Sequence, residues 1–149
     1  DKDAPVAVMM LCEVAAYYKL QGKTLWDAMV ELYEKYGYYK EDLATVTLKG
    51  IDGSQKITAM MNAFRENPPK ELGGFKVLAC RDYKSDCRRD MITGETTSNV
   101  LYYELENNAW CCVRPSGTEP KIKYYFGVKG ENFKDAEEKL EAIKKAMTE

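Results

Sequence analysis

The spacing of apolar residues changes near Leu43, and this change constrains the fold more than any other feature of the chain. Residues 4–20 leave little polar face over their first two turns, and residues 24–37 carry one apolar face, so both segments are predicted to be helical. From Leu43 onward apolar and polar residues alternate with a period of two, which is typical of a strand. We therefore expect a helical part over residues 1–40 and a separate strand-containing domain over residues 43–149.

Both predicted N-terminal helices carry end signals. Asp3 is placed to cap the first helix, and Gly22 lies where that helix would end. Thr24 and Asp27, three residues apart, resemble a capping box at the start of the second helix, which is expected to end near Gly37. Because the first helix is apolar around most of its surface, we expect a partner to cover it.

The domain after Leu43 is expected to have an α+β fold. Ser54 is predicted to cap a helix, and residues 84–97 have the composition of a solvent-exposed loop. Asn107-Asn108 predicts a tight hairpin turn, and Asn132 is predicted to cap a final helix. The apolar face of that helix would comprise Phe133, Ala136, Leu140, Ile143 and Met147. The expected order β-α-β-β-β-α gives one antiparallel sheet covered by helices on one face.

Between two strand-like runs lies a segment rich in groups that bind phosphate. Its residues are Arg114-Pro115-Ser116-Gly117-Thr118-Glu119-Pro120-Lys121. The arginine offers a planar fork of N–H donors, and the serine and threonine offer hydroxyl donors. The glycine is expected to take a positive φ and let the backbone approach an anion. Because the same residue types are common in turns, composition alone leaves both a binding loop and a plain turn open.

The string resembles the phosphate-binding loop of the α-D-phosphohexomutases, the phosphoglucomutase and phosphomannomutase family. Further segments resemble that family in the same order: Asp1–Ala4, Ala15–Lys19, Gly22–Leu25, Tyr33–Tyr38, Gly50–Gly53 and Ser98–Leu101. The resemblance covers nearly the whole chain but only the last part of a four-domain enzyme. It implies a fragment, in which residues 1–40 are the helical tail of the third α/β domain and residues 43–149 are the fourth, phosphate-binding domain.

The resemblance also implies a function. The parent enzyme would interconvert hexose 1-phosphate and hexose 6-phosphate, and this segment would hold the phosphate that is not being transferred. The residues implied at that phosphate are Arg114, Ser116, Gly117, Thr118 and Lys121, with Lys123 as a second source of positive charge and Lys2 as a candidate substrate contact. The transferable phosphoserine and the Mg²⁺ of the family belong to upstream domains. We therefore expect no catalytic residue, cofactor or metal in this segment, and no activity from it alone.

The composition limits which kinds of partner and which cellular compartment we expect for the chain. The chain has 22 basic and 24 acidic residues, which lacks the excess of positive charge that nucleic-acid binding usually requires. It shows no signal peptide, and the uncharged stretch from Ala4 to Cys12 is shorter than the roughly 18 residues of a membrane-spanning helix. A cytoplasmic chain with five free cysteines is expected. The absence of histidine removes the commonest general base.

Two other interpretations remain open at this stage. The chain could be a free-standing module that binds phosphate or phosphosugars, or an interaction domain in which the loop is only a turn. Within the resembled family, the run Pro120–Phe126 is more similar to the phosphoglucomutase branch, which favours glucose 1-phosphate and glucose 6-phosphate as ligands. A phosphomannomutase parent remains the alternative.

Overall fold

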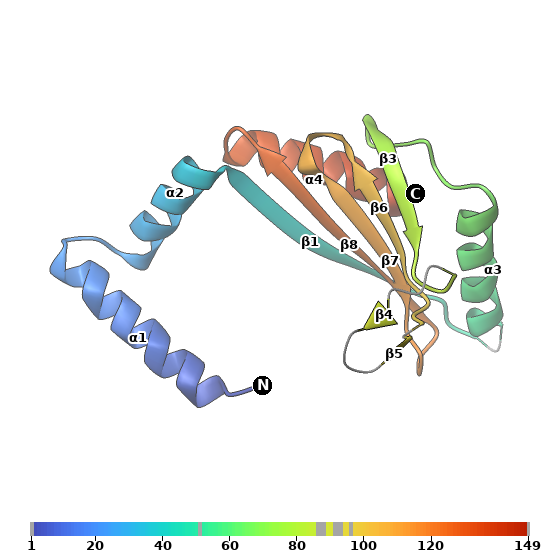
Figure 1. Ribbon diagram of the computed structural model, residues 1–149, viewed down its shortest axis with the longest axis horizontal. Helices are drawn as coiled ribbons and strands as arrows, with labels where there is room; N and C mark the ends of the chain where they lie inside the picture. Colours follow the sequence, from blue (N-terminus) through green and yellow to red (C-terminus); the bar gives the residue numbers. More distant parts are fainter. Residues whose placement is uncertain (1, 51, 86–88, 91–93, 96, 149) are drawn as a thin grey trace. The chain divides into compact units, whose positions relative to one another are not determined.

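The computed structural model describes residues 2–50, 52–85, 89–90, 94–95 and 97–148. Contacts between residues divide the chain into two compact units, residues 1–38 and residues 39–149. Figure 1 shows the helices and strands of both units.

The first unit contains two helices, α1 (Ala4–Leu20) and α2 (Leu25–Tyr36). The Asp3 carboxylate accepts a hydrogen bond from the Val6 amide at 3.1 Å, as the sequence predicts. Thr24 and Asp27 form the predicted capping box, in which each side chain accepts a hydrogen bond from the backbone amide of the other residue. Gly37, with φ of 109°, ends α2. The expected helix boundaries are therefore confirmed.

The apolar side chains of α1 are exposed. No residue of this helix is buried, whereas α2 buries Ala28. The large exposed apolar side chains on α1 are Val6, Val8, Met9, Met10, Leu11, Val14, Tyr17 and Leu20. Packing within the described part of this unit therefore contributes little to the stability of α1. The expected partner that would cover its apolar side chains is not found among the described residues of this unit.

The second unit is built on a six-stranded antiparallel sheet (Figure 1). The strands, in spatial order, are β1 (Tyr38–Thr47), β8 (Lys121–Gly130), β7 (Trp110–Pro115), β6 (Leu101–Leu105), β3 (Phe75–Asp82) and β2 (Glu71–Leu72). β1 begins five residues before the predicted start at Leu43, in a charged stretch without apolar alternation. Its charged side chains are accommodated by ion pairs to the last helix, Lys40 with Glu137 at 2.8 Å and Asp42 with Lys144 at 2.7 Å.

Two helices cover one face of the sheet, α3 (Gly53–Glu66) and α4 (Phe133–Thr148). Both pack against β8, and α4 passes behind the sheet in Figure 1. The core between them and the sheet contains Ile57, Met61, Leu101, Tyr103, Cys111, Val113, Ile122, Tyr124, Phe126, Ala136, Leu140 and Ile143. Alternate residues of β6, β7 and β8 supply the sheet side of this core, so neither α3 nor α4 covers the other sheet face, which we call the open face. The predicted α+β class with helices on one face is confirmed.

Several local expectations need correction. Ser54 does not cap α3, because the helix begins at Gly53 with Asp52 at the N-cap position and no side-chain capping bond. Phe133 is 41% exposed, although the other four predicted apolar residues of α4 are buried. Four strands of five or more described residues follow α3, one more than the expected order contains.

The two remaining connections are a short ladder and a hairpin turn. In the segment expected to be a loop, β4 (Arg89–Asp90) pairs with β5 (Gly94–Glu95), while residues 86–88, 91–93 and 96 lie outside the described residues. The predicted hairpin turn between β6 and β7 is confirmed: Asn107 and Asn108 have φ of 58° and 59° within the short 3-10 helix η1 (Glu106–Asn108).

The described residues contain neither a membrane-spanning helix nor a metal-binding cluster. None of the helices there is long and apolar enough to cross a membrane. No cluster of three or more Cys, Asp or Glu side chains in those residues could hold a metal ion. Cys12, Cys80, Cys111 and Cys112 are free thiols, and Cys87 lies outside the described part.

Candidate functional site

The 114–121 loop, defined as Arg114 to Lys121, joins two paired strands at one end of the sheet. β7 ends with Pro115 and β8 begins with Lys121, and Arg114 lies opposite Lys123 in the antiparallel register. The Ser116 amide donates a hydrogen bond to the Lys121 carbonyl at 2.8 Å, which closes the loop. Because both ends continue into central strands, the positions of the loop residues are fixed by the sheet.

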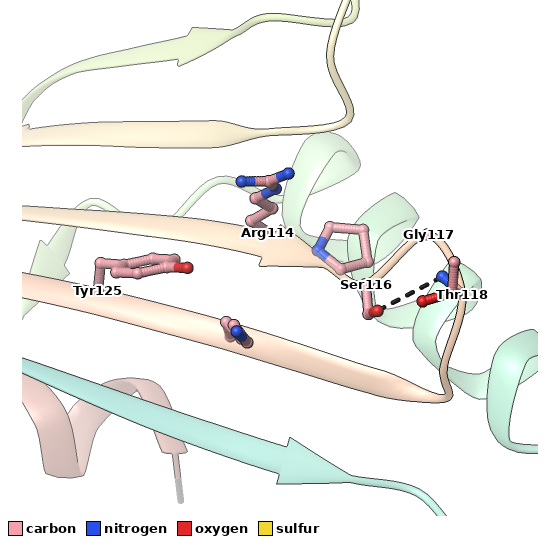
Figure 2. A pocket seen from close by; sticks show the side chains of 7 residues that line it. Arg114, Ser116, Gly117, Thr118 and Tyr125 are labelled. Carbon is pink, nitrogen blue, oxygen red and sulfur yellow. Dashed lines mark hydrogen bonds between the residues drawn. The ribbon is translucent and has the colours of Figure 1, made fainter. Parts of the chain in front are cut away.

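Ser116 organises the interior of the loop. Its hydroxyl oxygen accepts weak hydrogen bonds from the amides of Thr118 at 3.4 Å and Glu119 at 3.3 Å, and Figure 2 shows the first of these. The hydroxyl can still donate its own hydrogen to a ligand. Gly117 does not take the expected positive φ. No atom lies within 4 Å of the position that a Cβ would occupy there, so the glycine leaves open space rather than enabling a left-handed turn.

The lysines near the loop differ in their partners. The Lys121 ammonium lies 3.0 Å from each carboxylate oxygen of Glu119, so its charge is compensated within the loop. Arg114 and Lys123 make no ion pair with any residue of the described ranges. Two uncompensated positive charges on neighbouring strands attract an anion to the surface between them.

A hollow of about 280 Å³ lies at these two charges (Figure 2). We call it the front hollow, and its lining residues are Arg114, Pro115, Ser116, Gly117, Thr118, Lys123 and Tyr125. Lys123 and Tyr125 alternate along β8 with the buried Ile122 and Tyr124, so the hollow opens on the sheet face opposite α3 and α4. Four of the five predicted phosphate-binding residues line this hollow, and Lys121 does not.

Tyr125 is the residue that sequence reasoning did not assign to the site. In the sequence, apolar and polar residues alternate over residues 121–128, which is the pattern that places Lys123 and Tyr125 on one face of a strand. The alternation does not indicate that Lys123 and Tyr125 lie on the open sheet face, or that this face continues into the 114–121 loop. That information depends on which sheet face the helices cover.

A second hollow, of about 250 Å³, lies on the other side of the loop. It is lined by Ser54, Ile57, Thr58, Asn99 and residues 115–119. Arg65 links Asn99, which lines this hollow, to Asp82. Its guanidinium lies 2.8 Å and 3.2 Å from the two carboxylate oxygens of Asp82 and 2.5 Å from the Asn99 side-chain oxygen. The Arg65 guanidinium holds the pKa of the Asp82 carboxyl below its ordinary value.

Gly53 brings the start of α3 against the base of the loop. A Cβ at this position would lie 2.1 Å from the Leu48 carbonyl oxygen and 3.0 Å from the Pro120 Cβ. The Leu48 amide also donates to the Pro120 carbonyl at 3.0 Å. Only glycine permits this approach, and Gly53 is the last residue of the Gly50–Gly53 segment that resembles the family.

Two residues outside the hollow also bear on the site, the candidate contact Lys2 and the thiol of Cys112. Lys2 is an exposed residue of the first unit and remains a prediction. Cys112 lies two positions before Arg114 on β7, half-buried on the open sheet face. Burial raises the pKa of its thiol, and the nearby positive charge of Arg114 opposes that increase. The thiol is therefore protonated at neutral pH and adds no negative charge to the hollow.

The fold and the site together define an α+β domain that presents an uncompensated basic hollow on its open sheet face. No protein-family model matches the chain. The chain is 39% identical to the phosphoglucomutase of Staphylococcus aureus strain bovine RF122 / ET3-1 and 38% identical to that of strain USA300. Each alignment covers 96% of this chain but 27% of the relative. The chain is therefore homologous to phosphoglucomutase and matches a fragment-sized portion of that phosphohexomutase, which confirms the resemblance.

Proposed function

We propose that this chain is the C-terminal portion of a phosphoglucomutase and that its 114–121 loop binds the phosphate that is not being transferred. The parent enzyme would interconvert hexose 1-phosphate and hexose 6-phosphate, most specifically those of glucose. Because the substrate binds in two orientations, the loop must accept either end of the sugar. Hydrogen-bond donors that contact the phosphate and not the sugar ring suit this task.

The observation that carries this proposal is the uncompensated charge of Arg114 and Lys123 beside hydroxyl donors in one hollow. An arginine fork and a lysine together match the charge of a phosphate dianion. Ser116 and Thr118 line the same hollow and add donors of the kind that recognise phosphate oxygens. A plain turn would not require two cations without carboxylate partners, so the binding interpretation is favoured over the turn.

The proposal keeps the two parts expected from the sequence as parts of two domains of the parent enzyme. Residues 1–40 would be the helical end of its third domain, and residues 43–149 would be its fourth domain. The exposed apolar side chains of α1 support this assignment, because an apolar surface of this kind is normally covered by another part of the protein. The phosphoserine and Mg²⁺ would be supplied by upstream domains, so the chain alone is expected to be inactive and its place is the cytoplasm.

Two alternatives to this proposal predict different binding. A phosphomannomutase parent would bind mannose 1-phosphate better than glucose 1-phosphate. A free-standing module would bind phosphosugars as tightly without further domains as with them. The proposal instead predicts weak binding by this chain, with a dissociation constant of about a millimolar or higher, because one loop supplies only part of the contacts.

The test is an NMR titration of the isotopically labelled chain with inorganic phosphate and with glucose 1-phosphate. We expect saturable shifts of the Ser116, Gly117 and Thr118 amides. Replacement of Arg114 by alanine is expected to weaken binding about tenfold or more, because a charge-assisted bidentate contact is lost.

Arg81→Ala is the matched control. Arg81 is another strand arginine of the second unit, but it pairs with Glu104 and does not line the hollow. We expect that variant to bind phosphate as the unmodified chain does. Equal losses in both variants, or no response of the loop amides to phosphate, would contradict the proposal.

A further inference from the structure

The front hollow is larger than a phosphate group needs. Its volume of about 280 Å³ approaches the range of small-molecule sites and is several times the roughly 30 Å³ that one water molecule occupies in the liquid. The loop residues and Lys123 form one end of it, and Tyr125 forms the other. A phosphate held by Arg114 and the loop therefore leaves space toward Tyr125 for the group that carries the phosphate.

The position of Tyr125 on β8 fits that space. It lies two residues beyond Lys123 on the same side of the strand, which corresponds to about 6–7 Å along the sheet. Lys123 is in turn the register partner of Arg114. Figure 2 shows the Tyr125 ring lying along the strand with its hydroxyl directed toward the loop end of the hollow. The Tyr125 side chain thus lies farther along the sheet from the loop than Lys123 does.

The Tyr125 side chain has the chemistry that recognises a sugar. Its ring offers an apolar face for the C–H groups of a pyranose, and its hydroxyl both donates and accepts hydrogen bonds. No residue in the described part of the chain forms a hydrogen bond or ion pair with that hydroxyl. The hydroxyl is therefore available to a ligand hydroxyl without loss of an existing bond.

We infer that Tyr125 contacts the hexose of the bound phosphosugar and makes this domain sensitive to the sugar as well as to the phosphate. The inference rests on the proposed function and extends it, because the loop alone would treat inorganic phosphate and a sugar phosphate alike. Tyr125 is a specificity residue in this account. Arg114, Lys123 and the loop provide the affinity for phosphate.

The experiment compares two ligands in three variants of the full chain. Dissociation constants for inorganic phosphate and glucose 1-phosphate are measured by NMR for the unmodified chain, Tyr125→Phe and Tyr125→Ala. The phenylalanine variant removes only the hydroxyl, and we expect it to lose about two- to tenfold in affinity for glucose 1-phosphate. The alanine variant is expected to lose more. Both should bind inorganic phosphate unchanged.

Tyr39→Phe serves as the control, because Tyr39 is an exposed tyrosine of the same domain that does not line the hollow. It should bind both ligands unchanged, and amide spectra verify that each variant is folded. Equal losses for both ligands would mean that Tyr125 binds the phosphate, and no loss for either would mean that it binds nothing; each result overturns the inference while the proposed function stands. If phosphate fails to bind the unmodified chain, the proposed function fails and the inference fails with it.

Discussion

At the scale of single residues, the site depends on which cations have a partner. Glu119 takes up the charge of Lys121 inside the loop, while Arg114 and Lys123 face the front hollow without a carboxylate among the described residues. Lys121 and Lys123 are two positions apart on β8 and differ mainly in their partners. Their different environments therefore allow a direct comparison.

We predict that Lys123→Met weakens phosphate binding about three- to tenfold, whereas Lys121→Met weakens it less than twofold. The first substitution removes a charge at the hollow, and the second removes a charge that Glu119 already compensates. Titrations at low ionic strength measure both, and the difference should shrink as salt is added, because screening weakens exposed charges. A larger effect for Lys121 would show that the pair opens when phosphate binds.

The residue types of the site were predictable, but their surroundings were not. The string from Arg114 to Lys121 indicates phosphate chemistry by itself, because an arginine fork, two hydroxyls and a glycine are concentrated there. The pairing of Lys121 with Glu119, the acceptor role of Ser116 and the ordinary φ of Gly117 depend on how the loop closes. Loop closure is determined by strand register, which residue order alone leaves undetermined.

At the scale of elements, α3 supports the loop from behind. Its first residue, Gly53, lies against Leu48 and Pro120, and Arg65 near its end links it to Asp82 on β3 and to Asn99. One helix thus contacts the base of the loop at one end, and at the other end it contacts Asn99, which lines the second hollow. Changes at either contact should be detectable in the stability of the domain.

Gly53→Ala tests the first contact. The added methyl group would lie 2.1 Å from a backbone oxygen, which cannot move as a flexible side chain could. We expect a loss of about 2 kcal/mol or more, and a thermal midpoint lower by about 8 °C or more. Thermal unfolding followed by circular dichroism measures it. Ser54→Ala is the control, since that side chain makes no capping bond, and it should change stability by less than about 0.5 kcal/mol.

Asp82→Asn tests the second contact through its pH dependence. The pKa of Asp82 is lowered in the folded chain, so its contribution is complete above the unfolded pKa of about 3.9 and is lost as pH falls through the folded value. We expect the variant to be about 1 kcal/mol less stable at pH 7 and nearly equal to the unmodified chain well below pH 3.9. Urea unfolding across this range measures the difference. A constant difference would indicate a cause other than the ion pair with Arg65.

At the scale of the whole molecule, stability is distributed unevenly between the two units. The domain after residue 38 buries a continuous core, whereas α1 buries none of its residues. Most of the stability of a helix in a folded protein comes from the packing of its apolar side chains. Side chains on α1 therefore add little to the cooperative unfolding of the chain.

Hydrogen exchange should show this difference directly. We predict that amides in the central strands β6, β7 and β8 are protected at least about a hundredfold more than amides in the middle of α1. Exchange followed by NMR at dilute concentration measures both in one experiment. Comparable protection would mean that α1 is covered in solution, and dilution would then distinguish self-association from intramolecular packing.

The overall class was predictable because local signals agreed over most of the chain. Caps at Asp3 and Thr24 and the turn at Asn107-Asn108 all appear where residue chemistry places them. The early start of β1 was missed because Lys40 and Asp42 break the apolar pattern, and only α4 supplies their partners. Ion pairs between distant segments leave no periodic signal in sequence, so such boundaries depend on the assembled fold.

The position of β1 at the margin of the sheet has a consequence for solubility. A ten-residue strand at that position can pair with a strand of another molecule, which is a common route to aggregation. In this chain the strand contains consecutive charged residues at 40–42, two of which are held by ion pairs to α4. Charges in an edge strand oppose the addition of a further strand. The ion pairs that shift the start of β1 thus also protect the domain against edge-to-edge growth.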